Sequence, residues 1–340
     1  MDKVKFAIIG CGNIGKRHIA VVDAEEGAQL TAICDIDESV CIEQSTLYQN
    51  VPYYTNYHDL LKEVDCDFVN ICTPHALHKE MALAVISQGK NVLVEKPMAL
   101  SVKDCEEMNQ AAQKAGVKLY VVKQNRFNTP VRLLKQLLDS GKLGQVYMVK
   151  CDVLWNRYQG YYDESPWRGK KALEGGALFT QVSHFIDLLV WWFGDVIDAK
   201  AHLSTKSHEI EIEDCGNASI VFDSGTMGAI TWTTSVYSKN YEGSITIVGE
   251  NGTIKIGGKY LNKIEYWDVQ AWPLDTTIEY TDKPNLYGKY QGTSSNHPFV
   301  IEHIIQNFNQ NSGDVVEGTE GIRSIKAIEM IYKKSTASIK

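Results

Sequence analysis

A glycine-rich motif and a lysine further along the chain are the features of this sequence best suited to chemistry. The motif GCGNIG spans residues 10–15, and Lys96 lies in VEKP at 94–97. Closely spaced glycines allow a tight turn and a close approach of the backbone to a phosphate group. A lysine can hydrogen-bond a hydroxyl group, or remove its proton if the lysine pKa falls by roughly 2 to 3 units. Together they suggest a bound nucleotide with a reactive group beside it.

The glycine motif has the surroundings expected of a dinucleotide site. It follows a predicted strand and opens a predicted helix, so that Gly10 would make the turn, Gly12 would face the pyrophosphate and Gly15 would pack the helix on the strand. Asp35 ends the second predicted strand, twenty residues after Gly15. Its carboxylate can bind the ribose hydroxyls and would repel a 2′-phosphate, and Asp37 adds to that repulsion. The sequence therefore predicts NAD rather than NADP.

A second set of polar residues lies on a predicted helix over residues 176–192. Gln181, His184 and Asp187 fall at helical spacing on one side, whereas the other side is apolar. Two interpretations remain open for His184, namely a catalytic group or a hydrogen-bonded histidine of the core. Lys96 likewise is either a catalytic group, delivered at the end of a buried strand, or a surface lysine paired with a helix. Pro97 keeps Lys96 out of the helical region.

The first part of the chain has the pattern of an α/β domain with a doubly wound parallel sheet, the Rossmann type. Short apolar runs without polar alternation occur at 4–9, 29–34, 68–72, 91–95 and 118–122, separated by helical segments. One helix is predicted to begin after Ser101 and to end at Gly116. We expect an NAD-binding domain over residues 1–125, with Thr73 and Pro74 over the cofactor at the carboxyl edge of the sheet.

The second part has a different pattern. After a helix at about 127–140, the strands become long and alternating, with hairpin turns at Asp223-Ser224-Gly225 and at Asn251-Gly252, the latter predicted to be type I′. Two amphipathic helices are predicted at about 298–310 and 318–335. We expect residues 126–340 to form an α+β domain with an open-faced, mainly antiparallel sheet for substrate binding and oligomerisation.

Composition excludes several classes of function. The 34 basic and 42 acidic residues give a formal charge of −8 without a basic run, which disfavours nucleic acid. No apolar run is long enough for a signal peptide or a membrane span, so a cytoplasmic location is expected. The eight cysteines are predicted to be free thiols. No metal site is expected, because His75 and His78 lack other ligands at suitable spacing.

Several motifs together resemble the Gfo/Idh/MocA family of NAD(P)-dependent sugar and cyclitol oxidoreductases. The resemblance rests on GCGNIG with Asp35, TPHALH at 73–78, EKP at 95–97, QNRF at 124–127, WRG at 167–169 and the glycine, glutamine, histidine and aspartate of 175–187. It implies an active site between the two domains, and dimers or tetramers formed through the sheet. The implied cofactor contacts are Gly10, Gly12, Asn13, Ile14, Gly15, Asp35, Thr73, Pro74, His78, Glu95 and Gln124.

The resemblance also implies catalytic roles. Lys96 and His184 match the family's lysine and histidine that orient and deprotonate the hydroxyl being oxidised. Many members carry an aspartate four residues before this histidine, where this chain has Thr180. A three-residue proton relay is therefore not expected, and Lys96 and His184 form the predicted acid/base pair.

Within the family, residues 124–144 and 161–178 resemble the branch that acts on nucleotide-linked amino sugars in surface-polysaccharide synthesis. Members of that branch oxidise the 3-hydroxyl of UDP-N-acetylglucosamine or its uronic acid. Basic and aromatic residues here suit phosphate, carboxylate and sugar, or else serve in rim packing: Trp155, Arg157, Tyr161, Tyr162, Lys170 and Lys171. The predicted substrate contacts are Lys96, Arg126, Trp167, Arg168, Thr180 and His184. The alternatives are an inositol or free-sugar dehydrogenase, an NAD-dependent glycosidase and a non-enzymatic NAD-bound, sugar-sensing regulator.

Overall fold

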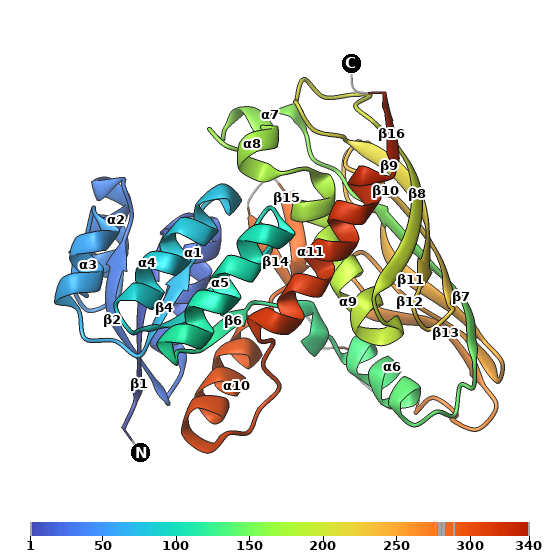
Figure 1. Ribbon diagram of the computed structural model, residues 1–340, viewed down its shortest axis with the longest axis horizontal. Coiled ribbons are helices and arrows are strands. Elements are labelled where there is room, and N and C mark those ends of the chain that lie inside the picture. The colour runs from blue at the N-terminus through green and yellow to red at the C-terminus, as the bar shows by residue number, and fades with distance from the viewer. Residues whose placement is uncertain (1, 276, 278–279, 281–282, 288–289, 339–340) are drawn as a thin grey trace. The chain divides into compact units, whose positions relative to one another are not determined.

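The computed structural model describes residues 2–275, 277, 280, 283–287 and 290–338 (Figure 1). The chain divides into two compact units, described separately below. The first comprises Met1–Lys123 with His297–Ile325, and the second comprises Gln124–Asn296 with Lys326–Lys340. The chain first passes from one unit to the other between Lys123 and Gln124, close to the predicted boundary at 125. The return of residues 297–325 to the first unit was not part of the prediction.

The first unit contains a six-stranded sheet in which every pairing is parallel. The strands lie in the order β3-β2-β1-β4-β5-β6. Their bounds are β1 Val4–Ile9, β2 Ala28–Cys34, β3 Tyr53–Tyr54, β4 Phe68–Ile71, β5 Asn91–Val94 and β6 Leu119–Val121. Nearly all residues of β1, β4, β5 and β6 are buried, which is why these runs lack polar alternation. The predicted Rossmann sheet is confirmed.

Helices join the strands of this sheet. They are α1 Asn13–Ala24, α2 Glu38–Leu47, α3 Tyr57–Glu63, α4 His78–Ser87 and α5 Val102–Ala115, with a 3₁₀ turn at His75–Leu77 before α4. Ser101 Oγ accepts a hydrogen bond of 3.0 Å from the Asp104 amide, and Gly116 ends α5 with φ of 70°. Both predicted ends of this helix are therefore confirmed. Helix α10, His297–Gln310, packs against α1, and α11 spans Gly318–Lys333.

The second unit is built on an eight-stranded mixed sheet in the order β13-β12-β11-β7-β10-β9-β8-β16. The bounds are β7 Val146–Leu154, β8 Val196–Ser204, β9 Cys215–Phe222, β10 Met227–Thr233, β11 Glu242–Gly249, β12 Gly252–Gly257, β13 Lys263–Val269 and β16 Ser335–Ser338. All neighbours are antiparallel except β7 with β10 and β8 with β16. The mainly antiparallel prediction is confirmed. Strands β14 Pro284–Tyr287 and β15 Tyr290–Ser294 form a separate pair.

The helices of the second unit are short except for two. They are α6 Thr129–Asp139, α7 Gln159–Asp163, α8 Lys171–Glu174 and α9 Ser183–Phe193, with a 3₁₀ turn at Gln124–Phe127 and a π-helical turn at Leu178–Val182. The predicted single helix over 176–192 thus includes a π turn directly before α9. This turn changes the angular spacing of the residues on either side of it.

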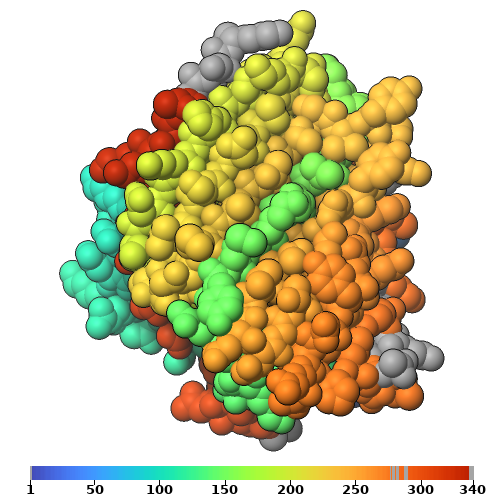
Figure 2. Space-filling view, turned by 90° about the vertical axis from the view of Figure 1, so that its right-hand side faces the viewer, coloured from blue at the N-terminus to red at the C-terminus, as the bar shows by residue number. Residues whose placement is uncertain are grey.

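The large sheet has one buried and one exposed face, as predicted. Along β10, Ile230 and Trp232 are buried, whereas Met227 and Thr231 are exposed. Figure 2 shows the exposed face, with β7 in green between the yellow and orange strands. Exposed large apolar side chains on the strands of this sheet include Tyr147, Met148, Ile197, Met227 and Tyr266. Assembly of copies through this face stays a prediction.

One hairpin prediction is wrong in its turn type. Strands β11 and β12 do form a hairpin, but Gly249 pairs with Gly252, so the central residues are Glu250 and Asn251. Neither has the positive φ that a type I′ turn requires. Gly252 is needed for another reason: a Cβ atom there would lie 2.5 Å from the Asp268 carbonyl oxygen on β13. The hairpin at 223–225 is confirmed, because it joins β9 to β10.

The structure agrees with the expectation for the cysteines. All eight are free thiols, and all but Cys215 are buried. Burial raises the pKa of Cys11, Cys72 and Cys151, as expected of thiols that serve as small core residues. Within the described part of the chain, every helix is too short or too polar to cross a bilayer.

Candidate active site

The glycine motif forms a cradle between β1 and α1. Gly10 has a φ of 94°, and a Cβ atom on Gly15 would lie 1.8 Å from the Gly10 carbonyl oxygen, so neither position accepts a larger residue. Gly12 differs, because nothing lies within 4 Å of the place where its Cβ would be. Helix α1 starts at Asn13 without a side-chain cap, and its first turn presents exposed Asn13 and half-buried Ile14. Open space beside an uncapped helix N-terminus fits the pyrophosphate of a dinucleotide.

Asp35 holds the edge of this cradle. Its Oδ2 accepts a hydrogen bond of 2.7 Å from the Cys11 amide, and its Oδ1 accepts one of 3.0 Å from the Asp37 amide. Asp35 thus fixes the glycine loop and keeps a negative charge next to it. This placement agrees with the predicted selection of ribose hydroxyls over a 2′-phosphate.

We expect Asp35→Asn to shift preference from NAD toward NADP. The carboxylate offers charged hydrogen bonds, each worth about 1.5–3 kcal/mol, and repels the extra phosphate. Loss of one such bond corresponds to a rise of about 10- to 150-fold in the Kd for NAD. Titration of both cofactors by fluorescence, with the exposed Asp139→Asn as the control, checks this. An unchanged NAD to NADP affinity ratio would show that Asp35 does not contact the ribose.

The residues after β4 are fixed by a buried histidine. Thr73 lies beside the glycine loop, since a Cβ on Gly10 would approach its Cγ2 to 3.1 Å. His78 is fully buried, with Nδ1 2.8 Å from the Pro97 oxygen and Nε2 3.0 Å from the Thr73 oxygen. A neutral imidazole carries one N–H, so one of these contacts is a donated hydrogen bond at a time. His78 therefore links the Thr73-Pro74 segment to the one that follows Lys96.

Glu95 and Lys96 follow the last residue of β5. The Glu95 side chain is buried, and its Oε2 accepts a hydrogen bond of 3.0 Å from the Lys96 amide. The Lys96–Pro97 peptide bond is cis. The predicted emergence of Lys96 at the carboxyl end of a buried strand is thus what the structure has.

In the second unit, a buried glutamate and tyrosine hold the start of the histidine helix. Gly176 has a φ of 145°, and a Cβ there would lie 2.0 Å from Tyr332 Oη. Tyr332 Oη donates a hydrogen bond of 2.7 Å to Glu213 Oε1, which also accepts one from the Leu178 amide. Burial raises the pKa of Glu213 to about 7. Sequence reasoning missed Glu213 and Tyr332, because neither belongs to a motif.

Gln181, Thr180 and His184 are all buried. Gln181 Oε1 accepts a hydrogen bond of 2.7 Å from Arg157, and its Nε2 donates one of 3.0 Å to Tyr161 Oη. Thr180 Oγ1 donates to the Gly176 oxygen at 3.2 Å. His184 is buried in the first turn of α9. His184 is thus held in a packed helix with Thr180 one π turn before it.

Arg126 forms an ion pair inside the second unit. Its Nε and Nη2 lie 2.8 and 3.0 Å from the two oxygens of Asp187, and its Cζ lies 4.6 Å from the Trp191 ring centroid. The charge of Arg126, a predicted substrate contact, is therefore already balanced. Gln124, a predicted cofactor contact, lies in the same unit and donates a hydrogen bond of 3.3 Å to Thr293 Oγ1.

Two other arginines lie together among aromatic rings. This arginine–tyrosine cluster consists of Arg157, Tyr161, Arg168 and Tyr290. Arg168 Cζ lies 4.2 Å from the Tyr161 ring centroid, and Arg157 Cζ lies 5.1 Å from that of Tyr290. Among the described residues, neither guanidinium forms an ion pair, and the Nε atom of each is buried without a hydrogen-bond partner. Trp167 borders the cluster, with its ring centroid 5.5 Å from Arg168 Cζ.

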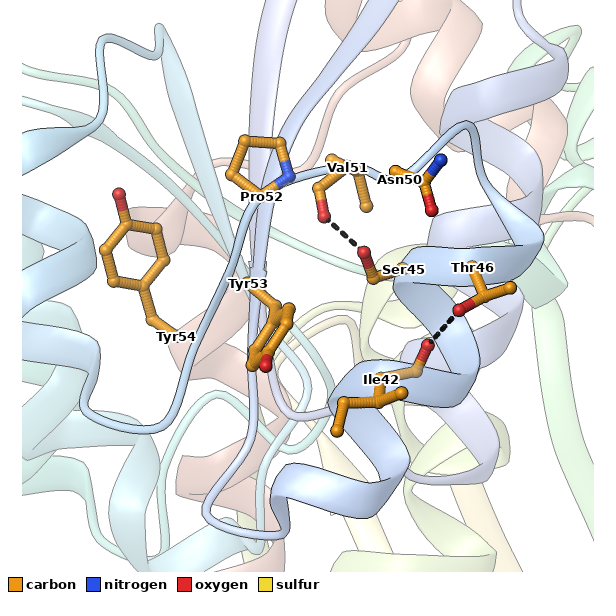
Figure 3. Close-up of a pocket in the computed structure, with 8 residues that line it drawn as sticks. All are labelled: Ile42, Ser45, Thr46, Asn50, Val51, Pro52, Tyr53 and Tyr54. Carbon is orange, nitrogen blue, oxygen red and sulfur yellow. Dashed lines mark hydrogen bonds between the residues drawn. The ribbon is translucent and has the colours of Figure 1, made fainter.

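A hollow beside α2 and β3 contains none of the predicted site residues. Its volume is about 670 Å³, and Figure 3 shows its lining residues. Ser45 Oγ donates to the Val51 oxygen at 2.7 Å and Thr46 Oγ1 donates to the Ile42 oxygen at 2.8 Å. The hydroxyls of Ser45 and Thr46 therefore already donate to backbone oxygens. None of the residues that line the hollow has a charged side chain that could bind a ligand.

Comparison with known proteins agrees with this geometry. Residues 4–123 match the model of an oxidoreductase family with an NAD-binding Rossmann fold, and residues 131–255 match the GFO/IDH/MocA C-terminal domain. The chain belongs to the Gfo/Idh/MocA family. The predicted family, fold class and NAD cofactor are confirmed. The roles of individual residues stay predictions.

The similar solved structures include two bacterial dehydrogenases bound to NADH and UDP-GlcNAcA. The WlbA dehydrogenase of Bordetella pertussis is 35% identical with a TM-score of 0.88, over 98% of this chain and 96% of that one. The WlbA enzyme of Chromobacterium violaceum is 34% identical with a TM-score of 0.90, over 98% and 94%. A 1-carboxy-3-chloro-3,4-dihydroxycyclohexa-1,5-diene dehydrogenase of Comamonas testosteroni is 29% identical over 67% of this chain, which spans only 57% of that relative's length.

Proposed function

We propose that this chain is an NAD-dependent dehydrogenase that oxidises a secondary hydroxyl of a nucleotide-linked sugar. The favoured position is C3 of a UDP-linked N-acetylamino sugar or its uronate. The observation that carries the proposal is the arginine–tyrosine cluster, where two guanidiniums lie among aromatic rings and form no ion pair with any residue that the structure describes. The two WlbA structures, which hold NADH and UDP-GlcNAcA, support the choice of substrate.

Lys96 and His184 are proposed to act on the reacting hydroxyl. Bound NAD supplies the acceptor for the hydride. Lys96 hydrogen-bonds the hydroxyl oxygen and stabilises the alkoxide character that develops there, and His184 accepts the proton. The hydroxyl of Thr180 is bound to the Gly176 oxygen, so it adds no third proton-transfer group. Lys96 and His184 are therefore proposed to handle the proton without the aspartate that many family members carry at the position of Thr180.

The arginine–tyrosine cluster is proposed to bind the anionic part of the substrate. Arg157 and Arg168 provide planar donors that match phosphate or carboxylate oxygens. Trp167 offers a ring face suited to a sugar or base. Arg126 is not proposed to bind the anionic part of the substrate, because its charge is already paired with Asp187.

The proposal is tested by following NADH formation with UDP-GlcNAcA, UDP-N-acetylglucosamine, glucose and myo-inositol. We expect turnover with a UDP-sugar, and a KM for it at least about 10-fold higher in Arg168→Met, because a charge-assisted contact is lost. Arg132→Met, an exposed arginine of α6, serves as the matched control. Turnover confined to glucose or inositol would reject the nucleotide-sugar assignment. Release of an aglycone without NADH would instead identify a glycosidase.

A further inference from the structure

A buried group of polar side chains surrounds Glu95 in the first unit. His18 of α1, Asn70 of β4, Glu95 and His297 of α10 each have at most 4% of their surface exposed. His18 Nε2 lies 2.9 Å from Glu95 Oε1, and His297 Nε2 lies 3.3 Å from the same oxygen. The proposed reaction gives no role to His18, Asn70 or His297. Burial of a charged carboxylate costs free energy unless hydrogen bonds or opposite charges compensate for the lost water.

The hydrogen bonds define the state of this group. Asn70 Nδ2 lies 3.1 Å from His18 Nδ1 and donates to it, so His18 carries its proton on Nε2 and donates that proton to Glu95. Burial alone would raise the pKa of Glu95. The contacts from His18 and His297 outweigh burial and hold the pKa of Glu95 well below its usual range. Glu95 is therefore a fixed negative charge.

A bound metal ion is an alternative role for the same cluster, but the hydrogen bonds of His18 disfavour it. His18, Glu95 and His297 offer three ligand atoms within 4.8 Å of one another. However, a metal would need the Nε2 lone pair of His18, and that atom donates to Glu95 while Nδ1 accepts from Asn70. Hydrogen bonding accounts for His18 and for its contacts with Asn70 and Glu95. His297 Nε2 lies 3.3 Å from Glu95 Oε1, but neither ring nitrogen of His297 has hydrogen-bond geometry with a described residue.

The second oxygen of Glu95 connects this group to Lys96. Glu95 Oε2 accepts the Lys96 backbone amide at 3.0 Å, while Oε1 faces the two histidines. One oxygen of the carboxylate thus contacts His18 of α1 and His297 of α10, and the other oxygen accepts the backbone amide of Lys96. We infer that Glu95, hydrogen-bonded to His18 and in contact with His297, is a positioning residue that holds Lys96 in its reactive place. This inference rests on the proposed role of Lys96.

Glu95→Gln tests the inference, because the surroundings can accept the amide. Asn70 Oδ1 is buried, and no described residue hydrogen-bonds to it. If the Asn70 amide rotates, Oδ1 can accept from His18 Nδ1, and His18 Nε2 can then accept from the new glutamine. The fold is kept while the charge is lost. We expect kcat with UDP-GlcNAcA to fall by about 10²-fold, as for a misplacement of about 1 Å, with the melting temperature nearly unchanged.

A double-mutant cycle separates positioning from a purely structural role. If Glu95 acts through Lys96, Glu95→Gln should lower the residual kcat of Lys96→Met by less than about twofold. An equal loss in both backgrounds, or wild-type kcat in Glu95→Gln, would overturn the inference. Wild-type kcat in Lys96→Met would instead contradict the proposed function itself.

Two further variants complete the test. His297→Phe keeps the ring but removes one contact to Glu95, so we expect a smaller fall in kcat, about 2- to 12-fold, in the same direction. This variant decides the matter if Glu95→Gln does not fold, since wild-type kcat in His297→Phe would then overturn the inference. Glu106→Gln makes the same chemical change at an exposed residue of α5 and should leave kcat unchanged.

Discussion

Replacing Lys96 with methionine is expected to lower kcat with UDP-GlcNAcA by about 10²- to 10⁴-fold, the usual contribution of a general acid or base. Methionine keeps most of the length of the side chain but removes the amine. Lys96 follows β5, and its backbone is held by Glu95, so the loss should be chemical rather than structural. His184→Ala should have an effect of similar size. Stopped-flow measurement of NADH formation, together with NAD titration, checks both.

The Kd for NAD separates catalysis from cofactor binding. We expect it to change by less than about twofold in both variants, because the glycine cradle and Asp35 remain intact. Lys118→Met is the matched control, since this lysine is exposed. A variant of Lys96 or His184 with wild-type kcat would remove that residue from the mechanism. Loss of NAD binding in step with kcat would make the residue a cofactor contact.

Asp187→Ala is expected to lower the free energy of unfolding by about 3–5 kcal/mol, the usual cost of removing one partner of a buried ion pair. Arg126 and Asp187 are both almost fully buried, and their two hydrogen bonds connect the QNRF segment to α9. Without the carboxylate, the Arg126 guanidinium would remain buried near the Trp191 ring after losing its two hydrogen bonds to Asp187. Urea unfolding followed by circular dichroism measures the change.

Two comparisons make this result specific. Asp139→Ala removes a carboxylate from an exposed ion pair with Lys135, and should change stability by less than about 1 kcal/mol. The double variant Arg126→Met/Asp187→Leu should recover most of the lost stability, because it removes both charges. If Asp187→Ala destabilises the protein no more than Asp139→Ala, the buried pair is not a structural anchor.

The parts of the site that sequence could predict are those built from residues close together in the chain. Gly10, Gly12 and Gly15 lie within one short motif between a strand and a helix, so the spacing within the motif predicts the place of each. Asp35 was identified by its distance from the motif, since strand and helix lengths place it at the same sheet edge. The two sheets were predictable for a similar reason, because buried parallel strands and one-sided antiparallel strands have different residue patterns.

The parts that could not be predicted depend on partners far apart in the chain. Glu213 and Tyr332 meet Gly176 only after folding, and His297 reaches Glu95 because residues 297–325 return to the first unit. No periodicity signals such pairs. The π turn at Leu178–Val182 also escaped prediction, since a helix with one wide turn has nearly the same apolar pattern as a regular one.

The central claim is that Lys96 and His184 act on one sugar hydroxyl. A crystal structure of the protein with NADH and UDP-GlcNAcA tests it most directly. The account predicts that Lys96 Nζ and a ring nitrogen of His184 both lie about 2.6–3.2 Å from the C3 hydroxyl oxygen, with Arg157 or Arg168 on an anionic group of the ligand. A sugar whose C3 hydroxyl contacts neither residue would contradict it.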